Sequence, residues 1–401
     1  MKWMTKPLAE IADFSLGKML DERKNRGEAL PYLANINVRW GEFDLENLRE
    51  MRFEQDEMER YGLKCGDILL CEGGEPGRCA VWKEPMPGVM YQKALHRIRP
   101  HDCLDYRFLF YSLLHKGRLG GFTPLLTGAT IKHLPREKLA GVEISFPSLE
   151  VQQRIADILS AYDDLIENNR RRMALLEESA RQLYREWFVR LRFPGHEHTP
   201  ITNGLPQGWE RKRIGDVADC VGGGTPSTAN AAYWDDGEIT WVTPTDVTRN
   251  KHFVLLDAEK KITEAGLQNS SAKLVKPHAI LMTSRASVGF FGIAGREVCT
   301  NQGFISVVPH EPVLTPYLVF HLSDRVEEIR SMGSGSTYPE VSRGKFREFE
   351  VVIPAHSFTL EFSEQASLHF AQIRVLKQHN ERLRAARDLL LPRLMNGEIA
   401  V

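Results

Sequence analysis

Two loops of similar composition carry the side chains in this sequence that are best suited to binding a ligand. The first loop reads LTGATIKHLPREKL over residues 126–139, and the second reads GSGSTYPEVSRGKF over residues 333–346. Lysine and arginine neutralise phosphates, and hydroxyl groups bind phosphate oxygens or base edges. The two loops therefore indicate contact with a nucleic acid, although each residue could equally be a structural hydrogen-bonding group.

Shorter segments add side chains that could read bases. The segment TSRASVG places Arg285 between serines, and arginine forms bidentate hydrogen bonds with guanine. The segment TNQG contributes Asn301 and Gln302, whose amides can pair with adenine, and we expect Gln92 to be the counterpart of Gln302. The candidate DNA-binding residues are Arg78, Gln92, Lys93, Thr130, Lys132, Arg136, Thr225, Ser227, Ser284, Arg285, Ser287, Asn301, Gln302, Ser336, Thr337, Tyr338, Arg343 and Lys345.

Catalytic and metal-binding motifs are absent from the sequence. There is no P-loop, no Gly-x-Gly-x-x-Gly after a strand, no His-Glu-x-x-His and no nucleophile elbow. His196 and His198 stand in a linker with no further ligand nearby, so we expect neither a metal site nor a catalytic site. The six cysteines contain no Cys-x-x-Cys pair and are expected to be reduced thiols.

Length and charge constrain the class of protein. A chain of 401 residues suggests two or more domains. The 52 basic and 53 acidic side chains nearly cancel, so any nucleic-acid surface must arise from local clustering. No apolar run is long enough to span a bilayer, and the first residues carry charges where a signal peptide would be apolar. We therefore expect a cytoplasmic protein.

The similar loops belong to a duplication of the whole chain. With a shift of 207 positions, Gly128 falls on Gly335 and Thr130 falls on Thr337, and the match continues into the segments that follow. Such a period is far longer than the 20 to 50 residues of a solenoid repeat. The sequence therefore predicts two related domains.

Each repeat consists of a strand-rich part followed by a long helix. Short apolar runs with Gly and Pro between them predict an α+β domain of roughly 145 residues. In the segments that follow, apolar residues recur at steps of three and four, as in a coiled-coil seam. The seam is expected to contain Ile155, Leu159, Ile166, Asn169, Met173, Leu176, Leu183, Phe362, Ile373, Leu376, Leu383 and Leu390.

The order of these parts predicts how the chain is arranged. If the first helix leads away from the first domain, the second helix must lead back, so the two helices can pair antiparallel with one globular domain at each end. The fold class is then α+β, with two similar recognition domains held apart by two long coiled-coil helices about a pseudo-twofold axis. The predicted boundaries are 1–147 for the first domain, 148–193 for the first helix, 194–199 for a linker, 200–354 for the second domain and 355–401 for the second helix.

Two similar but different binding domains at a fixed spacing suit duplex DNA, because half-sites on a duplex are matched by proteins with twofold symmetry. Since the domains differ, the two half-sites should differ in sequence. The rival interpretation is a scaffold that gathers protein partners through its helices and binds no DNA. The near-neutral charge supports that rival.

The motifs GGGTPS, TSRASVG, TNQGF, GSGSTYPEVSRGKF and LLPRLMNGEI, in this order and with the duplication, resemble those of DNA-specificity (S) subunits of type I restriction-modification enzymes. The resemblance covers nearly the whole chain. It implies a non-catalytic subunit whose two target-recognition domains each read one part of a bipartite DNA site, with the gap set by the helices. It also implies partnership with two adenine methyltransferase subunits and a restriction/translocase subunit.

Under this resemblance the chain has no cofactor of its own, and S-adenosylmethionine and ATP with Mg are expected on the partner subunits. The sequence has no NPPY or DPPY methyltransferase motif. The first repeat departs from the second, because it lacks GGGTPS and has CEGGEPGR where the second has TSRASVG. Such differences suit domains with different targets. Asn169 is expected to fix the helix register, with contact to a methyltransferase subunit as the alternative.

Overall fold

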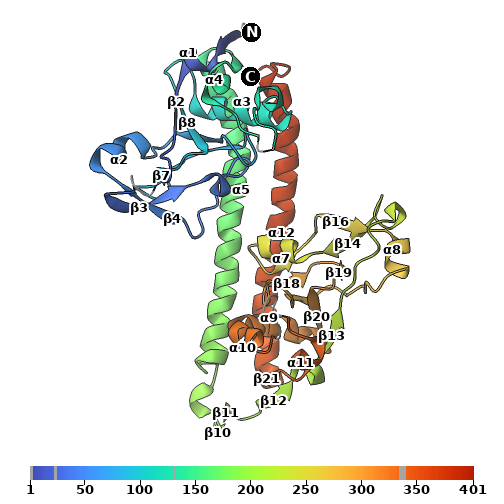
Figure 1. Ribbon diagram of the computed structural model, residues 1–401. Coiled ribbons are helices and arrows are strands. Elements are labelled where there is room, and N and C mark those ends of the chain that lie inside the picture. The colour runs from blue at the N-terminus through green and yellow to red at the C-terminus, as the bar shows by residue number, and fades with distance from the viewer. Residues whose placement is uncertain (1–2, 22–24, 131, 334–339) are drawn as a thin grey trace. The chain divides into compact units, whose positions relative to one another are not determined.

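The structure is a computed structural model that describes residues 3–21, 25–130, 132–333 and 340–401. The chain divides into two compact units, one of residues 1–166 with 382–401 and the other of residues 167–381 (Figure 1). Each unit combines a globular α+β domain with segments of the two long helices, α5 (Leu149–Tyr184) and α12 (His356–Met395). None of the helices described is long and apolar enough to cross a membrane.

The globular part of the first unit contains a four-stranded antiparallel sheet and a smaller three-stranded sheet. The larger has the order β2 (Ala12–Leu16), β8 (Leu95–Pro100), β5 (Ile68–Cys71), β6 (Cys79–Val81), and the smaller β4 (Arg49–Phe53), β3 (Glu28–Leu33), β7 (Met90–Tyr91). Strand β1 (Met4–Pro7) pairs with β9 (Glu143–Phe146). The helices are α1 (Leu8–Ile11), α2 (Gln55–Tyr61), α3 (Tyr106–Arg118) and α4 (Arg136–Ala140).

The second unit repeats this plan. Its larger sheet has the order β13 (Ala218–Gly222), β20 (Phe304–Pro309), β17 (Ile280–Thr283), β18 (Phe291–Ala294), β15 (Val254–Leu255), and its smaller sheet β16 (Lys260–Ile262), β14 (Ile239–Val242), β19 (Cys299–Thr300). Two further pairs are β10 (Ile201–Thr202) with β11 (Leu205–Pro206), and β12 (Glu210–Arg213) with β21 (Glu350–Ile353). The helices are α6 (Ile214–Val217), α7 (Pro244–Arg249), α8 (Glu264–Gln268), α9 (Thr315–Asp324), α10 (Val326–Ser331) and α11 (Arg343–Arg347).

The strand orders show the duplication directly. The order β2-β8-β5-β6 corresponds to β13-β20-β17-β18, and β4-β3-β7 corresponds to β16-β14-β19. Among the residues described, β15 is the one strand in the larger sheet of the second unit that has no counterpart in the first unit. The predicted pair of related α+β domains is therefore confirmed.

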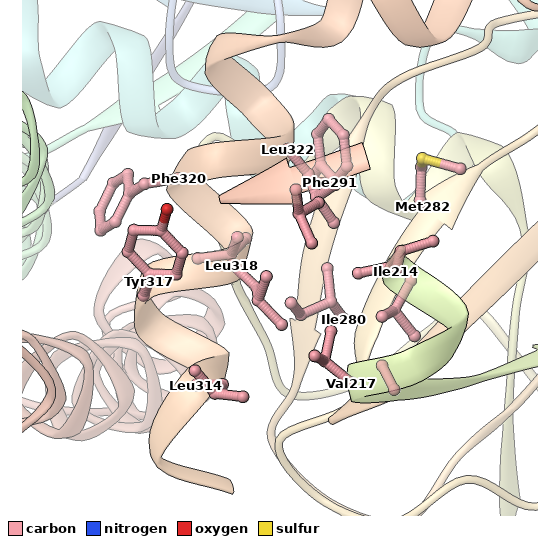
Figure 2. Packing of buried hydrophobic residues seen from close by; sticks show 14 of the residues in the cluster. Ile214, Val217, Ile280, Met282, Phe291, Leu314, Tyr317, Leu318, Phe320 and Leu322 are labelled. Atoms are coloured by element: carbon pink, nitrogen blue, oxygen red, sulfur yellow. The ribbon is translucent and has the colours of Figure 1, made fainter. Parts of the chain in front are cut away.

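Strands β5 and β17, which lie inside the larger sheets, are almost entirely apolar because both of their faces are covered. In β17, Ile280 and Met282 pack into one core while Leu281 packs into another, as the two-residue period of a strand requires. Figure 2 shows the first of these cores, in which Ile280 and Met282 lie among side chains of α6 and α9. Strand β5 of the first unit divides its side chains between two cores in the same way.

The long helices run antiparallel within each unit. In the first unit, Asp163 of α5 contacts Arg387 of α12, while Leu159 shares a core with Leu391. In the second unit, Asn169 bonds to Asn380, while Met173 shares a core with Leu376. Higher residue numbers in one helix thus meet lower numbers in the other, as predicted for an antiparallel coiled coil.

The predicted seam residues lie on the inward faces of these helix segments. Most are buried, namely Ile155, Leu159, Ile166, Asn169, Met173, Phe362, Ile373 and Leu376, and the others, Leu176, Leu183, Leu383 and Leu390, are half-buried. The first helix ends earlier than the predicted residue 193. After Tyr184 it passes into a π-helical turn, Arg185–Val189, because Trp187 and Phe188 turn into the aromatic core of the second domain.

One buried and one half-buried histidine make the stability of the second unit sensitive to acid. Burial, together with the positive charge of Arg325, lowers the pKa of His321 to about 3. Burial, together with Lys377 and Lys251, lowers the pKa of His252 to about 4. Both rings are therefore neutral in the folded state at pH 7, whereas in the unfolded chain they take up protons below about pH 6.5.

We predict that the free energy of unfolding falls as the pH is lowered from 6.5 towards 4. The unfolded state binds more protons in this window, so His252 alone should cost on the order of 2 kcal/mol by pH 5. Urea unfolding at pH 7.5 and pH 5 measures the loss, and His252→Asn should reduce it. An equal loss in the variant would show that His252 does not contribute.

Candidate nucleic-acid interface

In the second domain, backbone hydrogen bonds join the chain segments that carry the candidate residues. The N–H of Gly224 donates to the carbonyl of Thr300 (2.9 Å), and that of Ser284 donates to Gly303 (2.8 Å). The N–H of Val341 donates in turn to the carbonyl of Ser284 (2.9 Å). These bonds collect four segments at one end of the larger sheet. We call them the second frame, which comprises residues 222–225, 283–290, 300–303 and 340–343.

Glycines allow this close approach. A Cβ atom on Gly223 would lie 2.1 Å from the carbonyl oxygen of Asn301, and one on Gly224 would lie 2.2 Å from Oγ of Ser271. Both distances are far below van der Waals contact. The GGG motif in the sequence is therefore explained by backbone packing.

The second frame brings four of the predicted residues together on an exposed surface. The hydroxyl of Thr225 donates to Oε1 of Gln302 (2.5 Å), which orients the amide of Gln302. Arg285 is half-exposed, with its Nε 3.8 Å from a carboxylate oxygen of Glu340. Arg343 lies beside Gly222, since a Cβ atom there would be 3.4 Å from its Nη1. Hydroxyl, amide and guanidinium groups thus converge, as DNA recognition requires.

Other predicted residues of the second domain have structural contacts. Ser284 is buried and joins the frame through its backbone. Oδ1 of Asn301 accepts a hydrogen bond from the N–H of Gly303 (2.9 Å), which closes a local turn. Ser287 is exposed, and its carbonyl accepts a hydrogen bond from the hydroxyl of Thr283. Of these three residues, Ser287 alone offers an exposed side chain.

The remaining predictions of the second domain fall near the frame in sequence. Ser227 is exposed and its carbonyl accepts a hydrogen bond from Nε1 of Trp234 (3.0 Å). Lys345 is exposed on α11, which begins at the capping residue Ser342. Three predicted residues, Ser336, Thr337 and Tyr338, lie outside the described residues.

A cavity beside the GGGTPS loop was not anticipated from the sequence. It has a volume of about 420 Å³ and is lined by Thr228, Trp234, Lys260 and Lys261. The Lys260 ammonium lies 6.0 Å from the centroid of the Trp234 ring. Two lysines beside an aromatic ring suit a phosphate or a base. The sequence shows that the two lysines are adjacent. It does not show that they approach a tryptophan, because that contact depends on strand pairing.

The first domain contains the same frame. The N–H of Lys18 donates to the carbonyl of Tyr91 (3.2 Å), that of Glu72 donates to Ala94 (2.9 Å), and that of Leu134 donates to Glu72 (2.8 Å). A glycine again permits the approach, because a Cβ atom on Gly17 would lie 2.4 Å from the carbonyl oxygen of Gln92. We call residues 16–19, 71–78, 91–94 and 133–136 the first frame.

The matching bonds align the two frames residue by residue and correct one prediction. The N–H of Gln92 donates to Leu33 (2.9 Å), just as the N–H of Asn301 donates to Val242 (3.0 Å). Gln92 is therefore the counterpart of Asn301, and Gln302 corresponds to the next residue, Lys93. The expected equivalence of Gln92 and Gln302 was wrong by one position, because the offset between the repeats changes in the loops.

The cations predicted in the first domain differ in availability. Arg78 is only 13% exposed, and its guanidinium donates to the carbonyl of Asn35 (2.7 Å) and to Glu75 (3.0 Å). Lys93 is exposed, whereas Gln92 is half-buried. The first frame therefore presents Lys93 on its turn, while the arginine of its hairpin, Arg78, is held inward.

The loop of residues 126–139 flanks the first frame. Thr130 and Lys132 are exposed on either side of residue 131, in a loop closed by the bridge between Thr127 and His133. Arg136 begins α4, and its guanidinium lies 5.3 Å from the centroid of the Phe14 ring. These three side chains are placed around the same end of the larger sheet.

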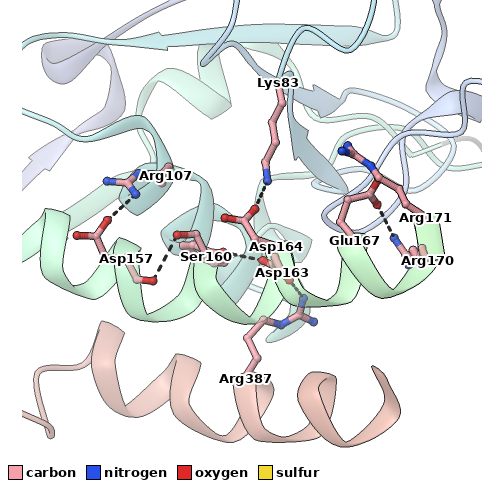
Figure 3. Close-up of polar contacts among 11 residues, drawn as sticks. Lys83, Arg107, Asp157, Ser160, Asp163, Asp164, Glu167, Arg170, Arg171 and Arg387 are labelled. Carbon is pink, nitrogen blue, oxygen red and sulfur yellow. Dashed lines mark hydrogen bonds and ion pairs between the residues drawn. The ribbon is translucent and has the colours of Figure 1, made fainter. Parts of the chain in front are cut away.

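Polar contacts on the long helices link them to each other and to the domains. In the second unit, Nδ2 of Asn169 donates to Oδ1 of Asn380 (2.8 Å), and both residues are buried. In the first unit, Asp163 pairs with Arg387 and accepts a hydrogen bond from the Tyr111 hydroxyl (2.6 Å) (Figure 3 shows the ion pair). A buried polar pair in a mostly apolar seam penalises other registers.

Further contacts fix each globular domain to its helix segments. Glu177 of α5 accepts a hydrogen bond from the N–H of Phe253 (2.7 Å), and Lys377 of α12 donates to the carbonyl of Val254 (2.5 Å). Burial raises the pKa of Glu177 and lowers that of Lys377 to about 8. In the first unit, Lys83 reaches Asp164 of α5 (2.7 Å) (Figure 3).

The geometry of the two frames defines a class of protein. The chain carries two versions of one polar, solvent-facing frame, one in each of its two related domains. Such an arrangement is that of a two-domain binding subunit. The chain belongs to the family described as the type I restriction modification DNA specificity domain, whose profile matches residues 1–178 and 206–357.

Known relatives agree with this assignment. The type I restriction enzyme HindI specificity subunit of Haemophilus influenzae is 22% identical over 85% of this chain and 88% of its own length. The MjaIX specificity subunit of Methanocaldococcus jannaschii is 34% identical, but the alignment spans 38% of this chain and 35% of that relative. Specificity subunits are the non-catalytic members of type I systems, in which catalysis resides on partner subunits.

A solved structure supports the fold. The crystal structure of a type I restriction-modification system S subunit from M. genitalium superposes with a TM-score of 0.59 at 17% identity. The superposition covers 98% of this chain and 96% of that chain. At this level of identity the likeness concerns the fold.

We predict that Gly223→Ala destabilises the second domain. The added methyl group meets rigid backbone at 2.1 Å, and such overpacking typically costs about 1 to 3 kcal/mol. Gly344→Ala is the matched control, because a Cβ atom at Gly344 would meet nothing within 4 Å. Chemical denaturation of both variants measures the difference. Equal stability of the two variants would contradict the role assigned to the close approach.

Proposed function

We propose that this chain is the sequence-specific DNA-binding subunit of a type I restriction-modification complex and reads a bipartite, asymmetric site. Each domain reads one half of the site, and the paired helices set the gap between the halves. The observation that carries the proposal is the presence of two frames with the same hydrogen bonds but different exposed side chains. One backbone used twice gives two related readers, and different side chains give them different targets.

The proposal extends to the partners of the chain. It places two adenine methyltransferase subunits and a restriction/translocase subunit on this subunit in the cytoplasm, with S-adenosylmethionine, ATP and Mg bound by those partners. Support comes from the family assignment, since specificity subunits direct catalysis that resides elsewhere. The chain itself would contribute DNA contacts and assembly surfaces.

A scaffold that binds only proteins is the alternative, and the balance of 52 basic against 53 acidic side chains favours it. The local grouping of Arg285, Arg343 and Lys345 around the second frame argues for DNA. Binding of the assembled complex to duplex DNA across a salt series separates the two, because phosphate contacts make affinity fall steeply with salt. Absence of duplex binding at low salt would favour the scaffold.

We predict that exchanging residues 200–354 for the equivalent domain of a relative changes one half of the methylated sequence. The other half should stay the same, because the first frame remains intact. Sequencing of adenine methylation in cells that carry the parent or the exchanged chain gives the result. A change in both halves would refute the assignment of one domain to one half.

We predict that lengthening both helices together changes the gap and leaves the half-sites intact. The insertion belongs after Ile166 and after Glu381, at the chain boundaries of the two compact units, because residues near 190 pack into the core of the second domain. One heptad in each helix keeps the seam in phase and adds about 10 Å, or about three base pairs.

The readout of this insertion is the methylated motif. Insertion of a heptad in α5 alone is the control, since it shifts the seam out of register and should abolish assembly. An unchanged gap in the paired variant would contradict the role of the helices as a spacer.

A further inference from the structure

The hairpins at the edges of the two frames have the same backbone. The N–H of Cys71 donates to the carbonyl of Arg78 (2.8 Å), and that of Thr283 donates to Phe290 (2.9 Å). The return bonds, from Gly77 to Cys71 (3.0 Å) and from Gly289 to Thr283 (2.9 Å), also match. Residues 71–78 therefore align with residues 283–290 without a gap.

The two hairpins also have positive φ angles at equivalent positions. Gly74 has a φ of +79° and its counterpart Ala286 has a φ of +61°. Gly77 and its counterpart Gly289 have φ values of +93° and +85°. The alignment of the two hairpins thus rests on both hydrogen bonds and dihedral angles.

This alignment shows that the arginine of the second hairpin has no equivalent in the first. Arg285 falls on Gly73, and its acidic neighbour Glu340 falls on His133, since Val341 and Leu134 make the same frame bond. The arginine that the first hairpin does contain, Arg78, is turned inward to Asn35. The first hairpin therefore offers no exposed guanidinium.

The turn that precedes β8 in the first domain and β20 in the second shows the reverse substitution. Here the cation is in the first domain and the neutral residue is in the second. Lys93 of the first frame occupies the position of Gln302 in the second, and both side chains are exposed. In the second frame this position is occupied by the neutral residue Gln302, whose side chain accepts a hydrogen bond from Thr225. Within these two segments alone, the exposed cation of the first frame thus lies on the turn, whereas that of the second frame lies on the hairpin.

We infer that the two domains read guanine from different positions of one shared backbone: Arg285 on the hairpin of the second domain, and Lys93 on the turn of the first. Arginine and lysine are the side chains that bind O6 and N7 of guanine in the major groove. Arg285 lies 3.8 Å from a carboxylate oxygen of Glu340, beyond hydrogen-bonding distance, and its side chain is half-exposed. The inference rests on the proposed function and adds the residues that give each half its specificity.

The test replaces each cation with the residue of the other domain, in the full chain assembled with its methyltransferase subunits. Arg285→Gly should lower the discrimination at one guanine of one half-site by about ten- to a hundredfold. Lys93→Gln should do the same in the other half-site. Binding to a panel of duplexes with single substitutions and sequencing of the methylated motif both measure this effect.

Matched controls lie at the far ends of the same strands. Arg296 follows β18 and resembles Arg285, with half-exposure and a loose acidic neighbour, Asp257, at 3.6 Å. Lys64 is exposed and precedes β5. Arg296→Gly and Lys64→Gln should leave the recognised sequence unchanged.

A gain-of-function variant guards against misfolding. A Cβ atom on Gly73 would meet nothing within 4 Å, so a side chain at this position starts in open space and Gly73→Arg is the variant of choice. Together with Lys93→Gln, it should move the guanine preference of the first half-site to another base pair.

The inference fails if Arg285→Gly or Lys93→Gln leaves discrimination unchanged, or if both relax the same half-site. A uniform loss of affinity on every sequence would assign these residues to phosphates and would also overturn it. The domain exchange of residues 200–354 remains as a separate test. If that exchange alters one half-site while the point variants alter none, the proposed function stands without this inference.

Discussion

In both domains, a glycine backbone packs closely against the turn that precedes β8 or β20. This close approach fixes the arrangement of the segments that face the ligand. Gly17 lies against Gln92, and Gly223 lies against Asn301, at distances that no side chain would permit. This packing holds the strand end, the hairpin and the turn in one frame. Side chains at given frame positions therefore occupy equivalent places in the two domains, whatever their chemistry.

Backbone hydrogen bonds determine how each frame folds, whereas its exposed side chains determine which sequence it binds. Replacing Arg285 or Lys93 removes no buried contact, so the exposed positions can vary while the sheet stays intact. The chain itself shows this, since the two frames differ at nearly every exposed position yet keep their hydrogen bonds. Buried polar contacts between the two long helices, such as that of Asn169 with Asn380, favour one helix register over others.

Several features could be predicted from the sequence because periodicity and duplication are direct consequences of packing. The seam positions follow from the helical period, and the two domains follow from the repeat. The inward turn of Arg78 could not be predicted, because it depends on the carbonyl of Asn35, which strand pairing brings near. The cavity of Trp234 and Lys260 likewise depends on tertiary contacts. The one-residue error at Gln92 arose because loop insertions shift the offset between repeats.

The most direct test of the account is site-specific photocrosslinking from the assembled complex to a duplex that carries one recognition site. A photoreactive residue at Gly73, where the backbone faces open space, reports on the first hairpin, and one at the exposed Ser287 reports on the second. We predict that the first crosslinks to one half-site and the second to the other. Crosslinks from both positions to the same half-site, or none from either, would contradict the account.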